Sequence, residues 1–298
     1  MSNYEKTVKE RMIKKYPKKL FGGTFRGKPY PHIFVNREDN FIDGKYPITK
    51  NIKGSLEEGE IEYNGEKHIN SSQVMCISYF KKFFEKEEYE PLLAEILMML
   101  KIDVSGTSFS TATFEYMPDG KERTNFDFYL TLSDGRSISW EIKFTESKFG
   151  GTTKTEGTND KYIKKWHEIY TPALRACAYY NYPSVDCDDF QCLSSGKLEN
   201  TCVKCHDCSI YDFYNHYQIR RNITLATKPG SYVIFLTPRE NINLDDERKY
   251  IDKYAREWAP ENIKNIYWED LIEITLKVVS CDDYLYDYFS KFQAKYFE

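Results

Sequence analysis

Residues 123–146, RTNFDFYLTLSDGRSISWEIKFTE, contain two stretches in which apolar and polar side chains alternate. Strict alternation is typical of a β-strand with one buried face, so the segment predicts two paired strands. The tripeptide SDG between them is a turn signal. One face of this hairpin carries Asp127, Glu141 and Lys143. The hairpin constrains the fold more than any other segment, and it raises the question of why two acids share one face.

The length of the turn decides which residues face each other. A two-residue turn would place the two apolar faces on opposite sides of the sheet. A three-residue turn over residues 133–135 aligns the apolar faces and puts its glycine in the left-handed position of a bulged turn. This turn pairs Leu132 with Arg136 and sets Asp127 directly across from Glu141. We therefore predict the three-residue turn.

Two carboxylates in that position have Cβ atoms about 4.5–5.5 Å apart and repel each other. They are tolerated on a wet surface or with a cation between them, and Lys143 balances only part of their charge. Carboxylate oxygens suit Mg²⁺ or Mn²⁺, which also bind substrate phosphates. The hairpin thus indicates either a metal site or a solvated face with an ion pair of about 0–1 kcal/mol.

The flanking segments predict an α/β protein. A helix is expected from the N-cap Ser71-Ser72, a second helix after Pro91, and a strand before the hairpin. A helix, a short buried strand and two more helices are expected after it. The core order is therefore helix, three strands, helix, strand, with an insertion after the third strand. The remaining elements are expected at 107–116, 211–226, 231–237, 244–258 and 267–279.

Glu95 is the only charge between Leu92 and Leu100, in a helix that is apolar on nearly every side. A buried carboxylate without a partner is costly. Glu95 either packs against the hairpin and completes a carboxylate cluster, or it faces water. Glu115, on the strand before the hairpin, is the alternative third acid.

An acid on a helix, Asp127 on a strand, and the sequence EIK at 141–143 on the next strand resemble the PD-(D/E)XK nuclease superfamily. This resemblance implies the restriction-endonuclease-like αβββαβ core, a mixed sheet flanked by helices. The usual proline is absent, because Phe126 precedes Asp127. The segments SSQ, RTNFDFYL, EIKFTESKFG and YQIRRN look like one bacterial group of restriction-endonuclease-like proteins, over roughly residues 70–150 and 210–280.

The resemblance implies DNA phosphodiester hydrolysis that depends on Mg²⁺ or Mn²⁺. Asp127, Glu141 and the carbonyl of Ile142 would hold the ion. Lys143 would orient the attacking water, and Glu95 would bind metal or water.

Gln218, Arg221 and Asn222 have i, i+3, i+4 spacing and would share one helix face. They are predicted, with Gln73, to contact nucleic acid or to steady the metal site. A solvated stripe on the helix, and helix capping for Gln73, are the alternatives.

Five cysteines lie between residues 187 and 208 with the spacing C-x4-C-x9-C-x2-C-x2-C. Thiolates at x2 spacing can bind a tetrahedral Zn²⁺, and such a clip would give a polar insertion a reason to fold. Reduced free thiols and an iron–sulfur cluster are the alternatives, and Cys187 is an alternative ligand. The predicted zinc ligands are Cys192, Cys202, Cys205 and Cys208.

The 298 residues are predicted to divide into a basic N-terminal extension (1–70) and a nuclease domain (71–298) with an insertion at 151–210. Residues 1–30 hold nine Lys or Arg against two Glu, and such an arm can bind phosphates. We expect a cytoplasmic protein without a membrane span, because no apolar run of about 18 residues occurs. No nucleotide-binding loop is present, so we expect no nucleotide cofactor.

The sequence therefore predicts an endonuclease that acts on DNA in bacterial defence or DNA processing, with a homodimer as a reasonable assembly. A DNA-binding module without catalysis is the alternative. An interaction protein with an exposed acidic hairpin is a third option.

Overall fold

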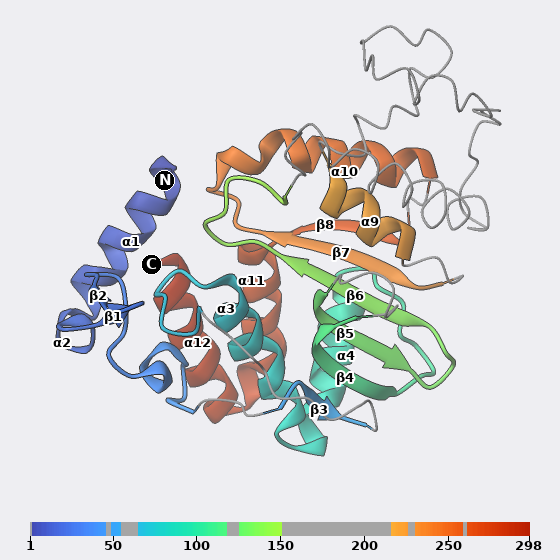
Figure 1. Cartoon of the computed structure of the whole chain (residues 1–298). Helices are drawn as coiled ribbons and strands as arrows, with labels where there is room; N and C mark the ends of the chain where they lie inside the picture. Colours follow the sequence, from blue (N-terminus) through green and yellow to red (C-terminus); the bar gives the residue numbers. More distant parts are fainter. Residues whose placement is uncertain are drawn as a thin grey trace, which may run out of the picture.

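A six-stranded mixed sheet forms the centre of the protein, as the computed structural model shows (Figure 1). The structure describes residues 2–45, 49–54, 65–117, 125–150, 216–225, 230–258 and 261–298. The strands from β3 to β6 are antiparallel, and β6, β7 and β8 are parallel. In spatial order the strands are β3 (Asn51–Lys53), β4 (Phe109–Tyr116), β5 (Phe126–Leu132), β6 (Ser137–Ile142), β7 (Tyr232–Thr237) and β8 (Ile263–Tyr267).

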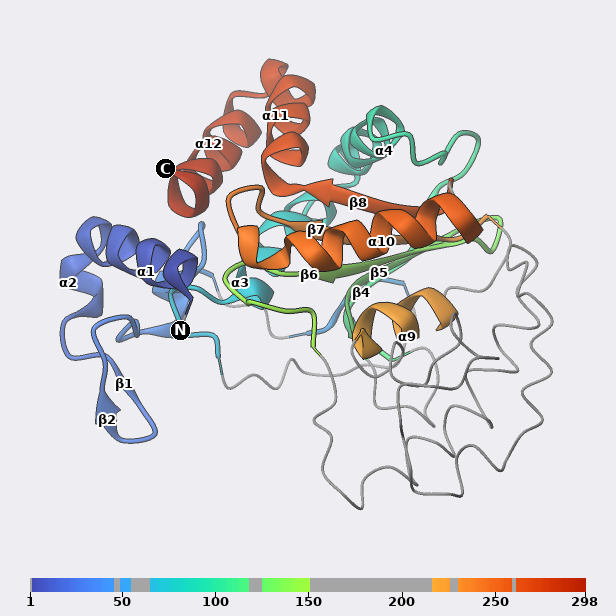
Figure 2. The ribbon, with the colours of Figure 1, turned by 90° about the horizontal axis from the view of Figure 1, so that it is seen from above.

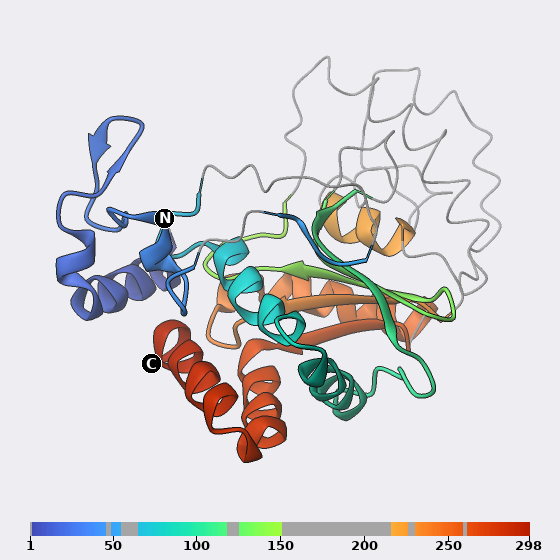
Figure 3. The same cartoon turned by 90° about the horizontal axis from the view of Figure 1, so that it is seen from below.

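Helices cover both faces of the sheet (Figures 2 and 3). One face carries α9 (Tyr217–Leu225) and α10 (Asp245–Trp258). The opposite face carries α3 (Ser72–Phe80), α4 (Glu90–Met99), α11 (Trp268–Val278) and α12 (Asp283–Phe297). The predicted mixed sheet with flanking helices is therefore confirmed.

Each helical layer buries its own apolar cluster against the sheet. On the α3 side, the ring of Phe80 stacks on Phe128 at 4.2 Å between centroids and contacts Trp140 at 4.8 Å. On the α9 side, Phe235 of β7 packs in a smaller cluster with Ile219 of α9. The apolar side chains of the hairpin thus face the larger cluster, and its polar side chains face α9 and α10.

The predicted hairpin turn is confirmed. Phe128 pairs with Trp140, and the amide of Leu132 donates to the carbonyl of Arg136 at 2.8 Å. Gly135 has φ +86°, the left-handed conformation expected of the last turn residue. The solvated face that we considered for the hairpin is wrong for β6, whose residues are all buried. Strand β7 pairs with β6 at its edge, and α9 and α10 cover that face of the sheet.

Local signals placed the first two helices of the core correctly. Ser71 is the N-cap of α3, and its hydroxyl accepts a hydrogen bond from the amide of Val74 at 3.2 Å. Pro91 lies in the first turn of α4, where its missing amide hydrogen costs no hydrogen bond.

The end of the chain differs from the prediction. Two helices were expected after β7, and the structure adds strand β8 and helix α12 to them. Strand β8 was missed because its short segment IKNIY, which pairs with β7, carries no clean alternation. The edge strand β3 was also missed. Short 3-10 helices lie at several places along the described chain: η1 (Arg37–Asn40), η2 (Lys81–Phe84), η3 (Glu87–Tyr89), η5 (Ile242–Leu244) and η6 (Val279–Cys281).

The N-terminal residues pack against the C-terminal helix. Helix α1 (Asn3–Lys15) contributes Val8 and Met12 to the larger core, and Lys15 Nζ donates to the carbonyl of Ala294 at 2.5 Å. Helix α2 (Pro17–Leu20) leads into a small hairpin of β1 (Thr24–Phe25) and β2 (Lys28–Pro29). Among the described residues, no helix has the length and apolar character needed to cross a membrane.

Candidate functional site

Three acidic side chains belong to a row across β4, β5 and β6. The β4–β5 pairs Phe114 with Phe128 and Tyr116 with Phe126 set Glu115 opposite Asp127. The β5–β6 pairing in turn sets Asp127 opposite Glu141. Neighbouring strands therefore bring three carboxylates to one end of the hairpin.

Glu141 is the best-held member of this row. Its side chain is 1% exposed. Lys143 Nζ and Gln218 Nε2 both donate to Oε1 at 2.6 Å, and Asn222 Nδ2 donates to Oε2 at 2.7 Å. Gln218 and Asn222 stand one turn apart on α9, so one helix face supplies both amides. Three donors on one buried carboxylate fix its orientation.

The carboxylate of Asp127 receives fewer hydrogen bonds than that of Glu141 within the described residues. Its Oδ2 accepts the backbone amide of Ile142 at 2.6 Å. Removal from water raises the pKa of Asp127 well above its usual range, and the charge of Glu141 raises it further. Lys143 lowers this pKa but does not cancel the increase. Ionising Asp127 is therefore costly in the folded protein unless a further cation lies beside it.

Lys143 is a cation at neutral pH. Burial alone lowers the pKa of its amine, but the charges of Glu141, Asp127 and Glu146 outweigh burial and raise it. The protonated amine donates hydrogen bonds and cannot serve as a base. It can orient a polar group beside the carboxylates or stabilise negative charge there.

Glu115 adopts a rare backbone conformation. Its φ of +51° lies in the left-handed region, which non-glycine residues seldom occupy outside functional or strained sites. Gln73 donates to one of its carboxylate oxygens, and Asn125 donates to the other at 2.9 Å. Removal from water raises the pKa of Glu115, the hydrogen bond from Asn125 opposes the change, and the charge of Glu141 adds to it. Glu115 is the acid that the structure adds to the Asp127–Glu141 pair.

The expectation that Glu95 completes the cluster is wrong. Glu95 is exposed on α4 and lines a separate cavity with Met98 and Phe109. Phe109 is the first residue of β4, and Glu115 lies near the last. Glu95 therefore lies beside one end of that strand and Glu115 lies at the other. The apolar sides of α4 pack into the core and leave Glu95 in water, which was the alternative from the sequence.

The structure places the predicted nucleic-acid contacts in two groups. Gln218 and Asn222 hold Glu141, and Gln73 holds Glu115, so these three amides support the carboxylates. Arg221 instead places its guanidinium 5.1 Å from the ring centre of Tyr217. Asn125 was not predicted, and nothing in its sequence context marked it.

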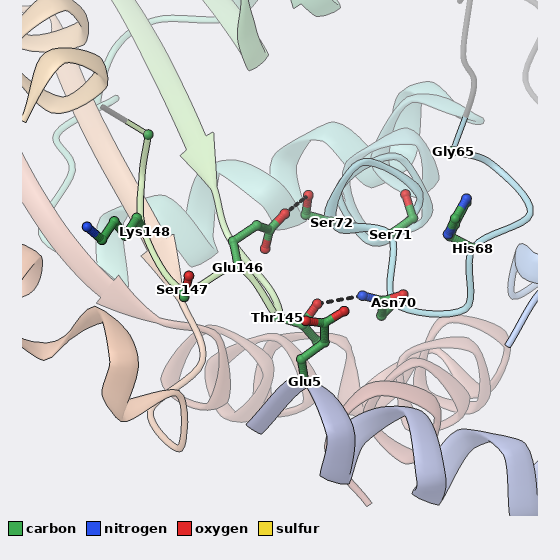
Figure 4. Close-up of a pocket in the computed structure, with 11 residues that line it drawn as sticks. Glu5, Gly65, His68, Asn70, Ser71, Ser72, Thr145, Glu146, Ser147 and Lys148 are labelled. Carbon is green, nitrogen blue, oxygen red and sulfur yellow. Dashed lines mark hydrogen bonds between the residues drawn. The ribbon is translucent and has the colours of Figure 1, made fainter. Parts of the chain in front are cut away.

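A polar cavity of about 600 Å³ lies beside the cluster, between the start of α3 and the segment that follows Lys143 (Figure 4). Ser72 donates to Glu146 at 2.7 Å, and Asn70 donates to Thr145 at 2.7 Å. Asn241 fixes the same segment by donating to the carbonyl of Glu146 at 2.8 Å. The cavity walls are therefore tied to the end of the strand that carries Glu141.

One family comparison covers nearly the whole chain. The model of the family described as Restriction Endonuclease associating with ARP matches residues 4–297. The chain belongs to this family. No curated protein and no solved structure matches it. Membership of the Restriction Endonuclease associating with ARP family agrees with the restriction-endonuclease resemblance and suggests a nuclease role.

The described residues of this family member contain no group of three or more His, Cys, Asp or Glu side chains already converged on a metal position. The donor set nevertheless fits a hard divalent cation, because it consists of carboxylate oxygens, and the charges of Glu141 and Glu115 both raise the pKa of Asp127. The amide oxygens of Gln73 and Asn222 are also buried here without a hydrogen-bond partner among the described residues. Buried unpaired acceptors are costly, and a hydrated cation would relieve them.

The predicted zinc ligands Cys192, Cys202, Cys205 and Cys208, with the alternative Cys187, lie outside the described residues. The zinc site therefore stays a prediction.

Proposed function

We propose that the protein is a Mg²⁺-dependent endonuclease of the PD-(D/E)XK restriction-endonuclease type that hydrolyses DNA phosphodiester bonds, in bacterial defence or DNA processing. One observation carries the proposal: Asp127 and Glu141 face each other across β5 and β6, with Lys143 hydrogen-bonded to Glu141. Two opposed buried acids are costly to fold, and a cation-dependent reaction gives them a purpose. The family membership supports nuclease chemistry.

Asp127, Glu141 and the carbonyl of Ile142 would hold Mg²⁺ or Mn²⁺. A divalent ion there supplies positive charge that polarises the phosphodiester and offsets charge developing in the transition state. Gln218 and Asn222 keep Glu141 in position from α9, through hydrogen bonds of 2.6 and 2.7 Å. The ligand orientation is thus built before DNA arrives, which avoids reorganisation during the reaction.

The remaining charged groups fit the handling of the attacking water. Lys143 stays protonated, so it would orient the water by donating a hydrogen bond and stabilise negative charge as the water loses its proton. Glu115 has a raised pKa, and it would hold water or metal in the role first predicted for Glu95. Arg221 would contact a phosphate, because Gln218 and Asn222 on the same helix already face the site.

Cleavage of DNA tests this proposal directly. Plasmid and linear DNA are incubated with the purified protein and Mg²⁺, beside Asp127→Ala, Lys143→Ala and the control Glu95→Gln. We expect wild type and Glu95→Gln to cleave equally, and the other two variants to lose at least about 100-fold in rate. Equal cleavage by all four proteins would point to a contaminating nuclease. Tight DNA binding without cleavage would leave the non-catalytic DNA-binding module as the function.

Metal analysis tests the zinc proposal. Protein purified without chelator should contain close to one equivalent of zinc if Cys192, Cys202, Cys205 and Cys208 bind it. About two to four equivalents of iron would favour the iron–sulfur alternative, and neither metal would favour free thiols. Sedimentation tests the proposed homodimer.

A further inference from the structure

The β1–β2 hairpin is a projecting element that the nuclease proposal does not use. Thr24 pairs with Pro29 and Phe25 with Lys28, so the two-residue loop is Arg26-Gly27. Both loop residues have positive φ, +50° and +75°, as a tight type I′ turn requires. Figures 2 and 3 show this hairpin extending away from α1 and α2. A defined turn, rather than a loose loop, therefore sets the direction of its tip.

The tip presents cationic and aromatic groups to solvent. Arg26 and Lys28 are exposed, and within the described residues neither forms an ion pair. The guanidinium of Arg26 lies 5.3 Å from the ring centre of Phe25. Phe21, at the base of the hairpin, is 88% exposed. Lys19, in contrast, is neutralised by Asp39 at 3.0 Å. Lys14 of α1 and Lys18 of α2 are also exposed and form no ion pair within the described residues, so the hairpin extends a cationic surface that begins on these helices.

The hairpin is anchored to the wall of the polar cavity beside the carboxylate cluster. The ring of Phe25 packs edge-on against His68 at 4.6 Å between centroids, and His68 lines that cavity. Gly23, at the hairpin base, leaves no room for a side chain, because a Cβ would lie 1.8 Å from the carbonyl of Ile33. The arm is therefore held at a fixed place on the same side of the cavity as the start of α3.

We propose that the β1–β2 hairpin is an arm that contacts the phosphate backbone of duplex DNA flanking the cleavage site, through Arg26 and Lys28. This inference rests on the proposed function. An arginine and a lysine without acidic partners recognise phosphates and release counterions from DNA when they bind. The exposed Phe21 ring adds an apolar surface that can pack against sugars or bases.

Binding in the absence of cleavage tests the arm. A labelled duplex of about 30 base pairs, a length that spans several phosphates on each strand, is titrated with full-length protein in chelator, by fluorescence anisotropy. The proteins are wild type, the double variant Arg26→Ala/Lys28→Ala, and the control Lys277→Ala/Lys291→Ala. Lys277 and Lys291 are exposed on α11 and α12, so the control removes equal charge elsewhere.

We expect the arm variant to bind at least about tenfold more weakly, and the slope of log K against log salt to fall by about 2, because each lost phosphate contact contributes about 0.9. The control should match wild type, and thermal unfolding should show both variants folded. Equal loss in the arm variant and the control, or wild-type binding by the arm variant, would overturn the inference.

The outcomes separate this inference from the nuclease proposal. Wild type that binds and cleaves DNA, with an arm variant that binds normally, overturns the arm alone. Wild type that binds through the arm but never cleaves with Mg²⁺ overturns catalysis alone. A preference of the arm for a single-stranded oligonucleotide of equal length would contradict the assignment to duplex DNA.

Discussion

Lys143 and Lys295 are both largely removed from water, and their surroundings are opposite. Lys143, on the α9 side, is 11% exposed and hydrogen-bonds Glu141. Lys295, in α12, is 3% exposed, and its amine donates to the backbone carbonyl and to Oδ1 of Asn40, the latter at 2.9 Å. Burial lowers the pKa of Lys295 to about 7, whereas the acids around Lys143 raise its pKa.

The contrast shows what burial and charge each contribute. Asn40 offers Lys295 neutral oxygens, which do not offset the loss of water around an ammonium group. The carboxylates near Lys143 more than offset the same loss. The pKa of Asp127 is nevertheless raised, first by its removal from water and then by the charge of Glu141, and Lys143 opposes this increase without cancelling it. The α9 side therefore holds an acidic cluster with Lys143 as the cation bonded to Glu141, whereas Lys295 is a structural amine bonded to neutral oxygens.

The largest effect that separates the two lysines should come from Lys143→Met. This change removes the only cationic partner that the described residues give Glu141. We expect the free energy of unfolding in chelator to fall by about 3 kcal/mol, as is common when one partner of a buried ion pair is lost. Mg²⁺-dependent DNA cleavage should fall by at least about 100-fold. Urea unfolding and plasmid cleavage measure both.

Lys295→Met is the matched control. It removes a buried amine of similar length but no partner carboxylate, so the cleavage rate should stay at the wild-type value. Its unfolding free energy near pH 7 should change by less than about 1.5 kcal/mol, because the lost hydrogen bonds to Asn40 are offset by the lost desolvation of the amine. Equal loss of cleavage in both variants would mean that Lys143 acts through folding alone.

The pH dependence of stability should also distinguish Lys295. Its pKa is about 7 in the folded protein, compared with an ordinary value of 10.5. Between these values the unfolded chain binds more protons than the folded chain, so stability rises with pH. The contribution is at most about 1.4 kcal/mol for each pH unit. We expect wild type to gain stability relative to Lys295→Met from about pH 7 to pH 9, measured by urea unfolding in chelator.

Parallel pH curves for wild type and Lys295→Met would contradict a lowered pKa at this position. Asp127 changes stability in the opposite direction, because its folded pKa is raised and its stabilising effect is lost as pH rises. The difference between the two curves removes that shared contribution.

The sequence predicted the parts of the site that depend on local rules. The three-residue turn fixed the hairpin pairing, because only that turn aligned the two apolar faces, and the pairing placed Asp127 across from Glu141. Ser71 was predicted as a helix cap because its hydroxyl needs only the next turn of backbone. In both cases the deciding contact is within a few residues in the chain.

The third acid could not be chosen from the sequence, because its position depends on long-range packing. The stretch of sequence between β4 and β5 is too long for a turn rule to predict which residues of the two strands pair. Only the observed pairing places Glu115 opposite Asp127. Glu95 was favoured because its neighbours are apolar, but the rotation of α4 against the core decides that it faces water. The burial of Lys295 had no signal, since lysine at the end of a helix is usually solvated.

The smallest predicted effect concerns how Glu141 is held without any change to Lys143. Gly150 has φ +113°, and a Cβ there would lie 2.9 Å from Oε1 of Gln218. Gly150→Ala should therefore push Gln218 away from Glu141 while the Lys143 hydrogen bond remains. We expect about fivefold slower cleavage, which corresponds to about 1 kcal/mol of lost positioning.

Gly135→Ala is the control for backbone strain, because Gly135 also has a left-handed φ, of +86°, but a Cβ there meets nothing within 4 Å. Both variants should lose about 1 kcal/mol of stability from the strained φ, and only Gly150→Ala should slow cleavage. A cleavage rate equally reduced in both would assign the effect to strain. An unchanged rate in Gly150→Ala would show that Lys143 and Asn222 position Glu141 without Gln218.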